Sequence, residues 1–134
     1  MITEATFTVS GFTPVTLDAA QVSTALGVGV ATMEKRFAGG AEGRSTTLFT
    51  SAFDPERGVG TYVAMESFVG SLGGRTGAFN FAHAATTRGE GRSDEYFTIV
   101  PGSGTGDLAG IAGGGALVVD ADGTHRMTFE YTLG

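Results

Sequence analysis

Apolar and polar residues alternate along most of the chain, which is the pattern of a β-strand with one buried face. The first example is the segment 4–9, where Ala5, Phe7 and Val9 alternate with polar residues. A change of phase near Ala31 predicts a bulge in the next segment. Only Thr16 to Leu26 has helical spacing, and we expect a turn or two of helix there. The alternation predicts eight strands, at residues 4–9, 28–37, 45–53, 61–69, 76–87, 95–100, 116–119 and 124–133.

Turn-forming residues separate these segments. Asp54 to Gly58 carries the Pro and Gly of a tight turn, and Asp120 to Gly123 ends in the Asp-Gly pair of a hairpin turn. Three further segments, 39–43, 70–74 and 106–110, share a Gly-x-(Leu/Ala)-x-Gly pattern. The first two lie between predicted strands, and we expect the central residue of each of these two corners to plug an end of the core. Closure leaves no exposed strand edge, so the pattern favours a barrel over an open sandwich. We therefore predict one all-β domain over residues 1–134, a closed antiparallel β-barrel of about eight strands.

Composition excludes several classes of function. The formal net charge is −6, and the 8 Lys and Arg residues are scattered, so no surface for nucleic acid is expected. There is no cysteine, which excludes disulfides and thiolate chemistry. No apolar run approaches the roughly 20 residues that span a membrane. The first residues, Met1 to Glu4, lack the basic and apolar regions of a signal peptide, so we expect a cytoplasmic protein.

The alternation also directs polar side chains into the interior of the predicted barrel, where desolvation shifts pKa values as acid–base catalysis requires. We expect Glu66 to act as a base and a histidine or Tyr62 as the proton donor. Lys35 also points inward, so it needs a carboxylate partner, either Glu66 or Glu42. The residues expected to share this interior are Glu66, His83, His125 and Tyr62 as catalytic groups, and Lys35, Arg75, Phe79, Phe81, Met127 and Phe129 as ligand-binding groups.

Other site chemistries fit less well. His83, His125 and Glu66 are a possible metal set, but nothing in their spacing marks one, and we expect neither metal nor cofactor. The run 102–106 lacks the Lys-Ser/Thr ending of a phosphate loop, so we interpret it as a structural turn whose hydroxyl groups bind local backbone. A serine triad of Ser103 and Asp107 with His83 has no nucleophile-elbow motif around its serine.

The run Val100 to Gly110 reads Val-Pro-Gly-Ser-Gly-Thr-Gly-Asp-Leu-Ala-Gly. It resembles the hallmark of the bacterial proteins grouped as domain of unknown function 3224. The family's first strand often carries a tryptophan, where this chain has Phe12 or a neighbour. Further segments that agree with the family are 35–39, 42–45, 62–66, 74–79 with His83 after it, and 125–131. The resemblance implies a small closed barrel similar to allene oxide cyclases and to some bacterial polyketide cyclases, and it implies no established reaction.

Two functions remain open. The first is a cofactor-independent isomerase or cyclase that moves a proton on a hydrophobic small molecule in the barrel. The second is a non-catalytic protein, either a ligand carrier or an oligomeric binding protein. An open lumen beside Glu66 and a histidine would favour the first. A lumen filled by the aromatic residues, with Glu66 in a salt bridge, would favour the second. Because related barrels form dimers or trimers, we also expect a homo-oligomer, with Phe49 and Phe53, or Phe68, at its interface.

Overall fold

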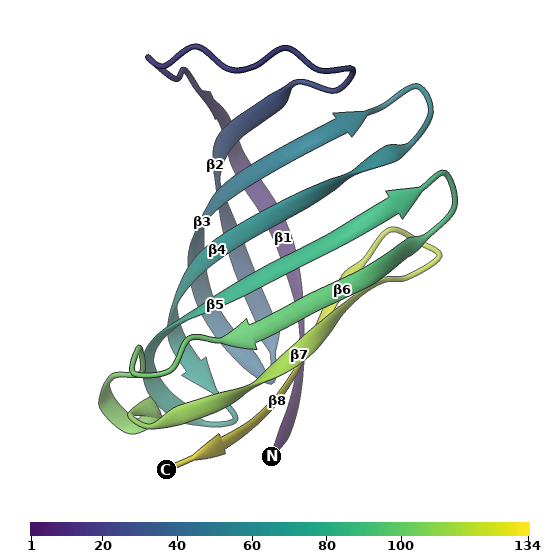
Figure 1. Cartoon of the computed structure of the whole chain (residues 1–134). Helices are drawn as coiled ribbons and strands as arrows, with labels where there is room; N and C mark the ends of the chain where they lie inside the picture. The colour runs from purple at the N-terminus through teal and green to yellow at the C-terminus, as the bar shows by residue number, and fades with distance from the viewer.

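Each strand pairs antiparallel with the next along the chain, and the last pairs with the first, so the sheet closes into a ring (Figure 1). The computed structural model describes all of Met1 to Gly134. The strands are β1 (Ile2–Val15), β2 (Val28–Gly39), β3 (Ala41–Asp54), β4 (Val59–Leu72), β5 (Arg75–Arg88), β6 (Arg92–Ile99), β7 (Ile111–Val119) and β8 (His125–Leu133). The expectation of an all-β fold with eight antiparallel strands is therefore confirmed. No helix has the length and apolar character needed to cross a bilayer.

The helical turn expected between Thr16 and Leu26 is wrong, because this segment contains neither helix nor strand. Figure 1 shows it as a dark blue loop beyond the ends of β1 and β2. Two of the apolar residues that a helix would have buried are exposed: Val22 at 87% and Leu17 at 43%. A helix this short is marginal in water without tertiary packing.

The bulge expected near Ala31 lies instead in β1. β2 pairs with β3 without interruption from Val28 to Phe37, whereas the register between β1 and β2 shifts between Ser10 and Thr13. Ala31 therefore continues the inward-facing series of its strand and is 4% exposed. Val28 lies on the outer face and is 50% exposed.

One end of the ring is sealed by the corners that the glycine pattern predicts. Up-and-down topology brings the β2–β3, β4–β5 and β6–β7 connections to the same end, beside both termini (Figure 1). Ala41 and Leu72, the central residues of the first two corners, are each 0% exposed, which confirms their expected role as plugs. Leu108, at the centre of the third glycine segment, is also 0% exposed and plugs the same end. Leu108 lies in a short 3-10 helix, η1 (Gly106–Leu108).

The run 100–106 substitutes for a missing strand beside the first half of β5. β6 is paired with β5 only as far as Phe81. Beyond that residue, Ser103 Oγ accepts from the backbone N–H of Asn80 at 2.9 Å, and Thr105 Oγ1 accepts from that of Ala78 at 3.0 Å. The structural role expected for this run is therefore confirmed, but its hydroxyl groups bind the backbone of β5 as well as local backbone. Ser103 is not free to act as a nucleophile.

The sequence pattern misses the first half of β7. Residues 111–115 are Ile-Ala-Gly-Gly-Gly, which shows no alternation. A Cβ atom at Gly113 or Gly115 would collide with the backbone carbonyl of Glu130 or Thr128 on β8. Glycine is therefore required here by the close approach of the two strands, and β-propensity does not report it.

Side chains fill the sealed half of the ring. The ring centroid of Phe129 lies 5.7 Å from that of Phe81 and 5.9 Å from that of Phe79, and both pairs of rings pack edge to face. Phe68, which we expected at an oligomer interface, is 2% exposed and belongs to this core. The buried core cluster consists of Ala5, Phe7, Phe37, Ala41, Phe68, Leu72, Phe79, Phe81, Ile99, Leu108, Ile111, Met127, Phe129 and Tyr131.

The sealed end gives a first prediction. Leu72→Ala should lower the free energy of unfolding by about 2–5 kcal/mol, because it opens a cavity in a closed core. The matched variant Leu48→Ala, on the outer wall at 61% exposure, should change it by less than about 0.5 kcal/mol. Urea denaturation measures both. Equal effects from the two variants would contradict the assigned core.

Candidate functional site

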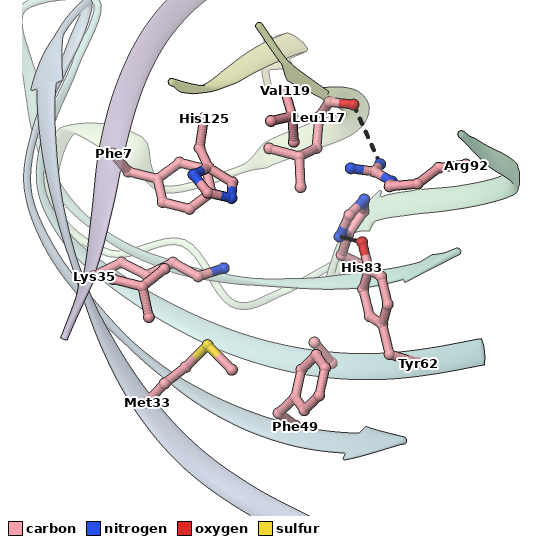
Figure 2. A pocket seen from close by; sticks show the side chains of 12 residues that line it. Phe7, Met33, Lys35, Phe49, Tyr62, His83, Arg92, Leu117, Val119 and His125 are labelled. Atoms are coloured by element: carbon pink, nitrogen blue, oxygen red, sulfur yellow. Dashed lines mark hydrogen bonds between the residues drawn. The ribbon is translucent and has the colours of Figure 1, made fainter. Parts of the chain in front are cut away.

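The other end of the ring holds a cavity of about 240 Å³. It lies between the side chains that point inward near the open ends of the strands (Figure 2). The lining residues are Phe7, Val9, Met33, Lys35, Phe49, Tyr62, Ala64, His83, Arg92, Leu117, Val119 and His125. Every one of the eight strands contributes at least one of them. The cavity is therefore the unfilled part of the ring interior.

Several residues expected to bind a ligand do not reach this cavity. Phe79, Phe81, Met127 and Phe129 are at most 1% exposed and form the packed core beneath it. Arg75 is the first residue of β5, so it lies at the sealed end of the ring, and it is exposed. Arg75 is odd-numbered, like the inward-facing residues of β5, but at the end of the strand its side chain is no longer enclosed by the ring.

Glu66 is held in a buried ion pair beneath the cavity. Its Oε1 atom lies 2.7 Å from Lys35 Nζ, and its Oε2 atom accepts from the hydroxyl group of Ser45. Glu66 is 1% exposed and does not line the cavity, whereas Lys35 does. The expected partnership of Lys35 with Glu66 is confirmed, and the alternative partner, Glu42, is exposed on the outer wall. Both carboxylate oxygens are occupied, so Glu66 is not placed to act as a base on a molecule in the cavity.

A hydrogen-bonded chain runs from Tyr62 and His83, which line the cavity, to Glu95 outside the lining. Tyr62 Oη lies 3.1 Å from His83 Nδ1, and His83 Nε2 lies 2.7 Å from Glu95 Oε2 (Figure 2 shows the first of these bonds). Burial lowers the pKa of His83, although the hydrogen bond that His83 makes to Glu95 opposes this shift. His83 is therefore neutral at neutral pH. Its Nε2–H donates to Glu95, which leaves Nδ1 to accept from the Tyr62 hydroxyl group.

Burial also raises the pKa of Tyr62, so this phenol keeps its proton through the neutral range. Its ring stacks on Phe49, with the centroids 5.3 Å apart and the planes 23° from parallel. The stacking and the bond to His83 hold the Tyr62 hydroxyl group in one position at the cavity wall. Tyr62 and His83 were both expected in the interior, and the structure brings them together.

Arg92 and Glu95 close the weakest seam of the ring. β6 and β7 share a single backbone pair, Thr98 with Gly114. Beyond it, Arg92 Nη2 donates to Glu95 Oε2 at 2.7 Å and to the backbone carbonyl of Leu117 at 3.2 Å. The backbone N–H of Leu117 donates to the same Glu95 oxygen at 3.0 Å. Two side chains therefore take the place of the missing backbone hydrogen bonds.

The sequence analysis did not identify Arg92 or Glu95. Glu95 carried a usable signal, since it shares its parity with Phe97 and Ile99, which point inward. Arg92 has the opposite parity. It reaches the inner side because the strand register shifts beside Asp94, which has a φ of 55°. A period-two pattern cannot locate such a bulge.

His125 is the first residue of β8 and faces the cavity, as expected. Its ring centroid lies 5.2 Å from that of Phe7, and Figure 2 shows the two rings together on one wall. His125, His83 and Glu66 do not assemble into a group that could hold a metal ion. The serine triad is also wrong, because His83 binds Tyr62 and Glu95 while the exposed Asp107 lies in η1 at the sealed end.

Loss of the Glu66 charge should destabilise the protein. Glu66→Gln leaves the Lys35 ammonium group buried without a counter-charge, and we expect it to lower the free energy of unfolding by about 3–5 kcal/mol. The double variant Lys35→Met with Glu66→Leu removes both charges and should recover most of that loss. Urea denaturation of the three proteins checks this, and a Glu66→Gln variant as stable as the wild type would show that the ion pair contributes nothing.

His83 should make the protein sensitive to acid. Its folded pKa lies below the value of about 6.5 that it has when unfolded, so between these two pKa values the unfolded chain binds more protons. Stability attributable to His83 is complete above pH of about 6.5 and falls as the pH falls toward the folded pKa, by at most about 1.4 kcal/mol per pH unit.

Urea denaturation at pH 7.5, 6.5 and 5.5 measures this effect. The wild type should lose more stability across the series than His83→Gln, which has no imidazole to titrate. Tyr62→Phe serves as the control and should keep the slope of the wild type, because burial is the main cause of the shift at His83. Parallel curves for wild type and His83→Gln would contradict the assignment.

Comparison with known proteins agrees with the resemblance in the sequence. The chain matches the family model described as "Protein of unknown function (DUF3224)" over residues 3–131. It is also similar to the crystal structure of a protein with unknown function from the DUF3224 family of Shewanella oneidensis MR-1. The two chains are 30% identical, with 100% of this chain and 97% of that chain covered and a TM-score of 0.86. No curated protein matches the chain. With almost its whole length matched, this protein belongs to the DUF3224 family.

Proposed function

We propose that this protein is a small-molecule-binding barrel that takes a hydrophobic molecule into the cavity at the open end. The observation that carries the proposal is that cavity, to which every strand contributes a lining residue. Its wall is mainly apolar, with a few polar groups at fixed positions, as in known ligand sites. Its volume of about 240 Å³ suits a ligand smaller than a typical drug, since drug-sized sites span about 300–1,000 Å³.

The proposed barrel is similar in shape to the allene oxide cyclases. An eight-stranded ring leaves an interior just wide enough for packed side chains or for one small ligand. In this protein the two uses divide the interior: the core fills the sealed half, and the cavity takes the other half.

Methionine methyl signals can test ligand entry directly. Met33 lines the cavity, whereas Met65 is on the outer wall at 48% exposure. Titration of protein carrying ¹³C-methyl methionine with benzyl alcohol should shift the Met33 signal in a saturable way and leave Met65 unchanged. Equal, unsaturable shifts of both signals would mean non-specific contact and would rule out the cavity as the binding site.

A second candidate function is proton transfer, favoured by the Tyr62–His83–Glu95 chain, whose first two residues line the cavity. In this proposal the Tyr62 oxygen takes a proton from a C–H group next to a substrate carbonyl while its own proton passes to His83 Nδ1. The substrate becomes an enolate, and Glu95 stabilises the imidazolium that forms. Because burial raises the pKa of Tyr62, the two transfers must be concerted and cannot proceed through a free phenolate. Glu66, the base expected from the sequence, has no part in this step.

Deuterium exchange at a bound ketone tests this chemistry without knowledge of the natural product. The wild type should accelerate exchange of the α-protons of phenylacetone in D₂O, followed by ¹H NMR. Tyr62→Phe should slow the enzymatic rate by about 10²–10⁴-fold. Tyr96→Phe, at an outer-wall tyrosine that is 58% exposed, should leave it unchanged. A wild-type rate equal to that of buffer would eliminate catalysis and leave the binding function.

Self-association remains part of the proposal, with a changed interface. Phe68 is buried in the core, and Phe49 is stacked on Tyr62, so only Phe53 of the three expected interface phenylalanines is largely exposed, at 50%. The outer wall of β3 and β4 adds exposed apolar residues. These are Leu48, Val63, Met65 and Val69. Sedimentation velocity would give the number of copies.

A further inference from the structure

The charged groups that line the cavity are all cationic. Lys35 and Arg92 are among its lining residues, and no aspartate or glutamate is. The other polar lining groups are the phenol of Tyr62 and the imidazoles of His83 and His125. A ligand in this cavity therefore faces hydrogen-bond donors with positive charge and no carboxylate.

The two cations come from opposite sides of the ring. Lys35 is on β2 and Arg92 is on β6, four strands apart in a ring of eight. Figure 2 shows the Lys35 ammonium group reaching toward the middle of the cavity, with Arg92 on the facing wall. The carboxylate that pairs with each cation does not line the cavity. Glu66 pairs with Lys35 from beneath the cavity. Glu95 pairs with Arg92 along the seam, where it also binds His83 and Leu117. Both ion pairs therefore turn their positive ends to the cavity.

Both cations also keep unused donors. The only hydrogen-bond partner of Lys35 Nζ is Glu66 Oε1, although an ammonium group has three N–H donors. Arg92 donates through Nη2 alone, so the N–H groups of its Nη1 atom have no partner. An acceptor in the cavity would give such donors a partner, and hydrogen bonds to charged groups are the stronger ones. A carboxylate has about four lone-pair sites, enough to accept from groups on more than one wall.

From this arrangement we propose that the ligand is a small apolar monoanion: a carboxylate carried on an aromatic or short aliphatic body. The inference rests on the proposed binding function and specifies its ligand class. The carboxylate lies among the donors of Lys35 and Arg92, and the body packs against Phe7, Met33, Phe49 and Leu117. Charge-assisted hydrogen bonds are about twice as strong as neutral ones, so an anion is preferred over a neutral carbonyl of the same shape.

A matched pair of probes tests the charge preference. Phenylacetate and phenylacetamide have nearly the same shape and differ in charge. Each is titrated into wild-type protein at constant ionic strength, with the Met33 methyl signal as the readout and Met65 as the control. We expect phenylacetate to bind at least about tenfold more tightly. Equal affinities, or a preference for the amide, would overturn the anion proposal while leaving the binding function intact. A Met33 signal that responds to neither probe nor to benzyl alcohol would overturn the binding function itself.

A second comparison assigns the preference to the cavity. Arg92→Gln keeps a hydrogen-bond donor but loses the charge, and it should reduce the ratio of the two affinities at least about threefold. Arg36→Gln makes the same change on the outer wall of β2 and should leave the ratio unchanged. Equal reductions in the two variants would show an effect of net charge and would overturn the assignment. If Arg92→Gln does not fold, the wild-type comparison still decides the anion proposal.

Discussion

The interior of an eight-stranded ring is about as wide as the side chains that point into it, and this constraint governs the rest of the molecule. Every second residue of every strand competes for one narrow space. Phenylalanines fill that space from the sealed end up to about the level of Phe81. Above them the inward residues change to Lys35, Tyr62, His83 and Arg92, which do not pack into a solid core. The boundary between core and cavity therefore lies where polar side chains first take inward positions.

The Lys35–Glu66 pair lies at that boundary. A charged pair inside protein is costly to desolvate, and packed apolar residues of the same volume would often be as stable. Beneath the open cavity, the pair does something that apolar residues could not do: it holds the Lys35 cation at the cavity floor. Ser45 occupies the second carboxylate oxygen, which fixes the orientation of Glu66 and so the position of Lys35.

The sequence predicted those parts of the fold that depend on period two. Tyr62 and His83 were placed inward correctly because β4 and β5 pair without a break over these residues. Ala41 and Leu72 were identified at their corners because glycines flank them. Three features could not be predicted from the alternation, each for its own physical reason. β7 begins with glycines, which are required by its close contact with β8. The side chain of Arg92 points inward because of a bulge in β6, and that of Arg75 lies outside the interior because the residue is at a strand end. The division of the interior into core and cavity could not be predicted from the sequence pattern either, because it depends on the summed volumes of side chains from all eight strands.

The seam between β6 and β7 ties the polar wall of the cavity to the integrity of the ring. Arg92 and Glu95 hold Leu117 in place of backbone hydrogen bonds, and the same two residues order the polar wall of the cavity. Variation at either position would therefore alter the closure of the ring and the polar wall of the cavity together. Met33, Phe49 and Val119 line the same cavity and take no part in those hydrogen bonds. Substitutions that reshape the cavity are therefore tolerated best at these apolar side chains, while the architecture holds the polar wall in place.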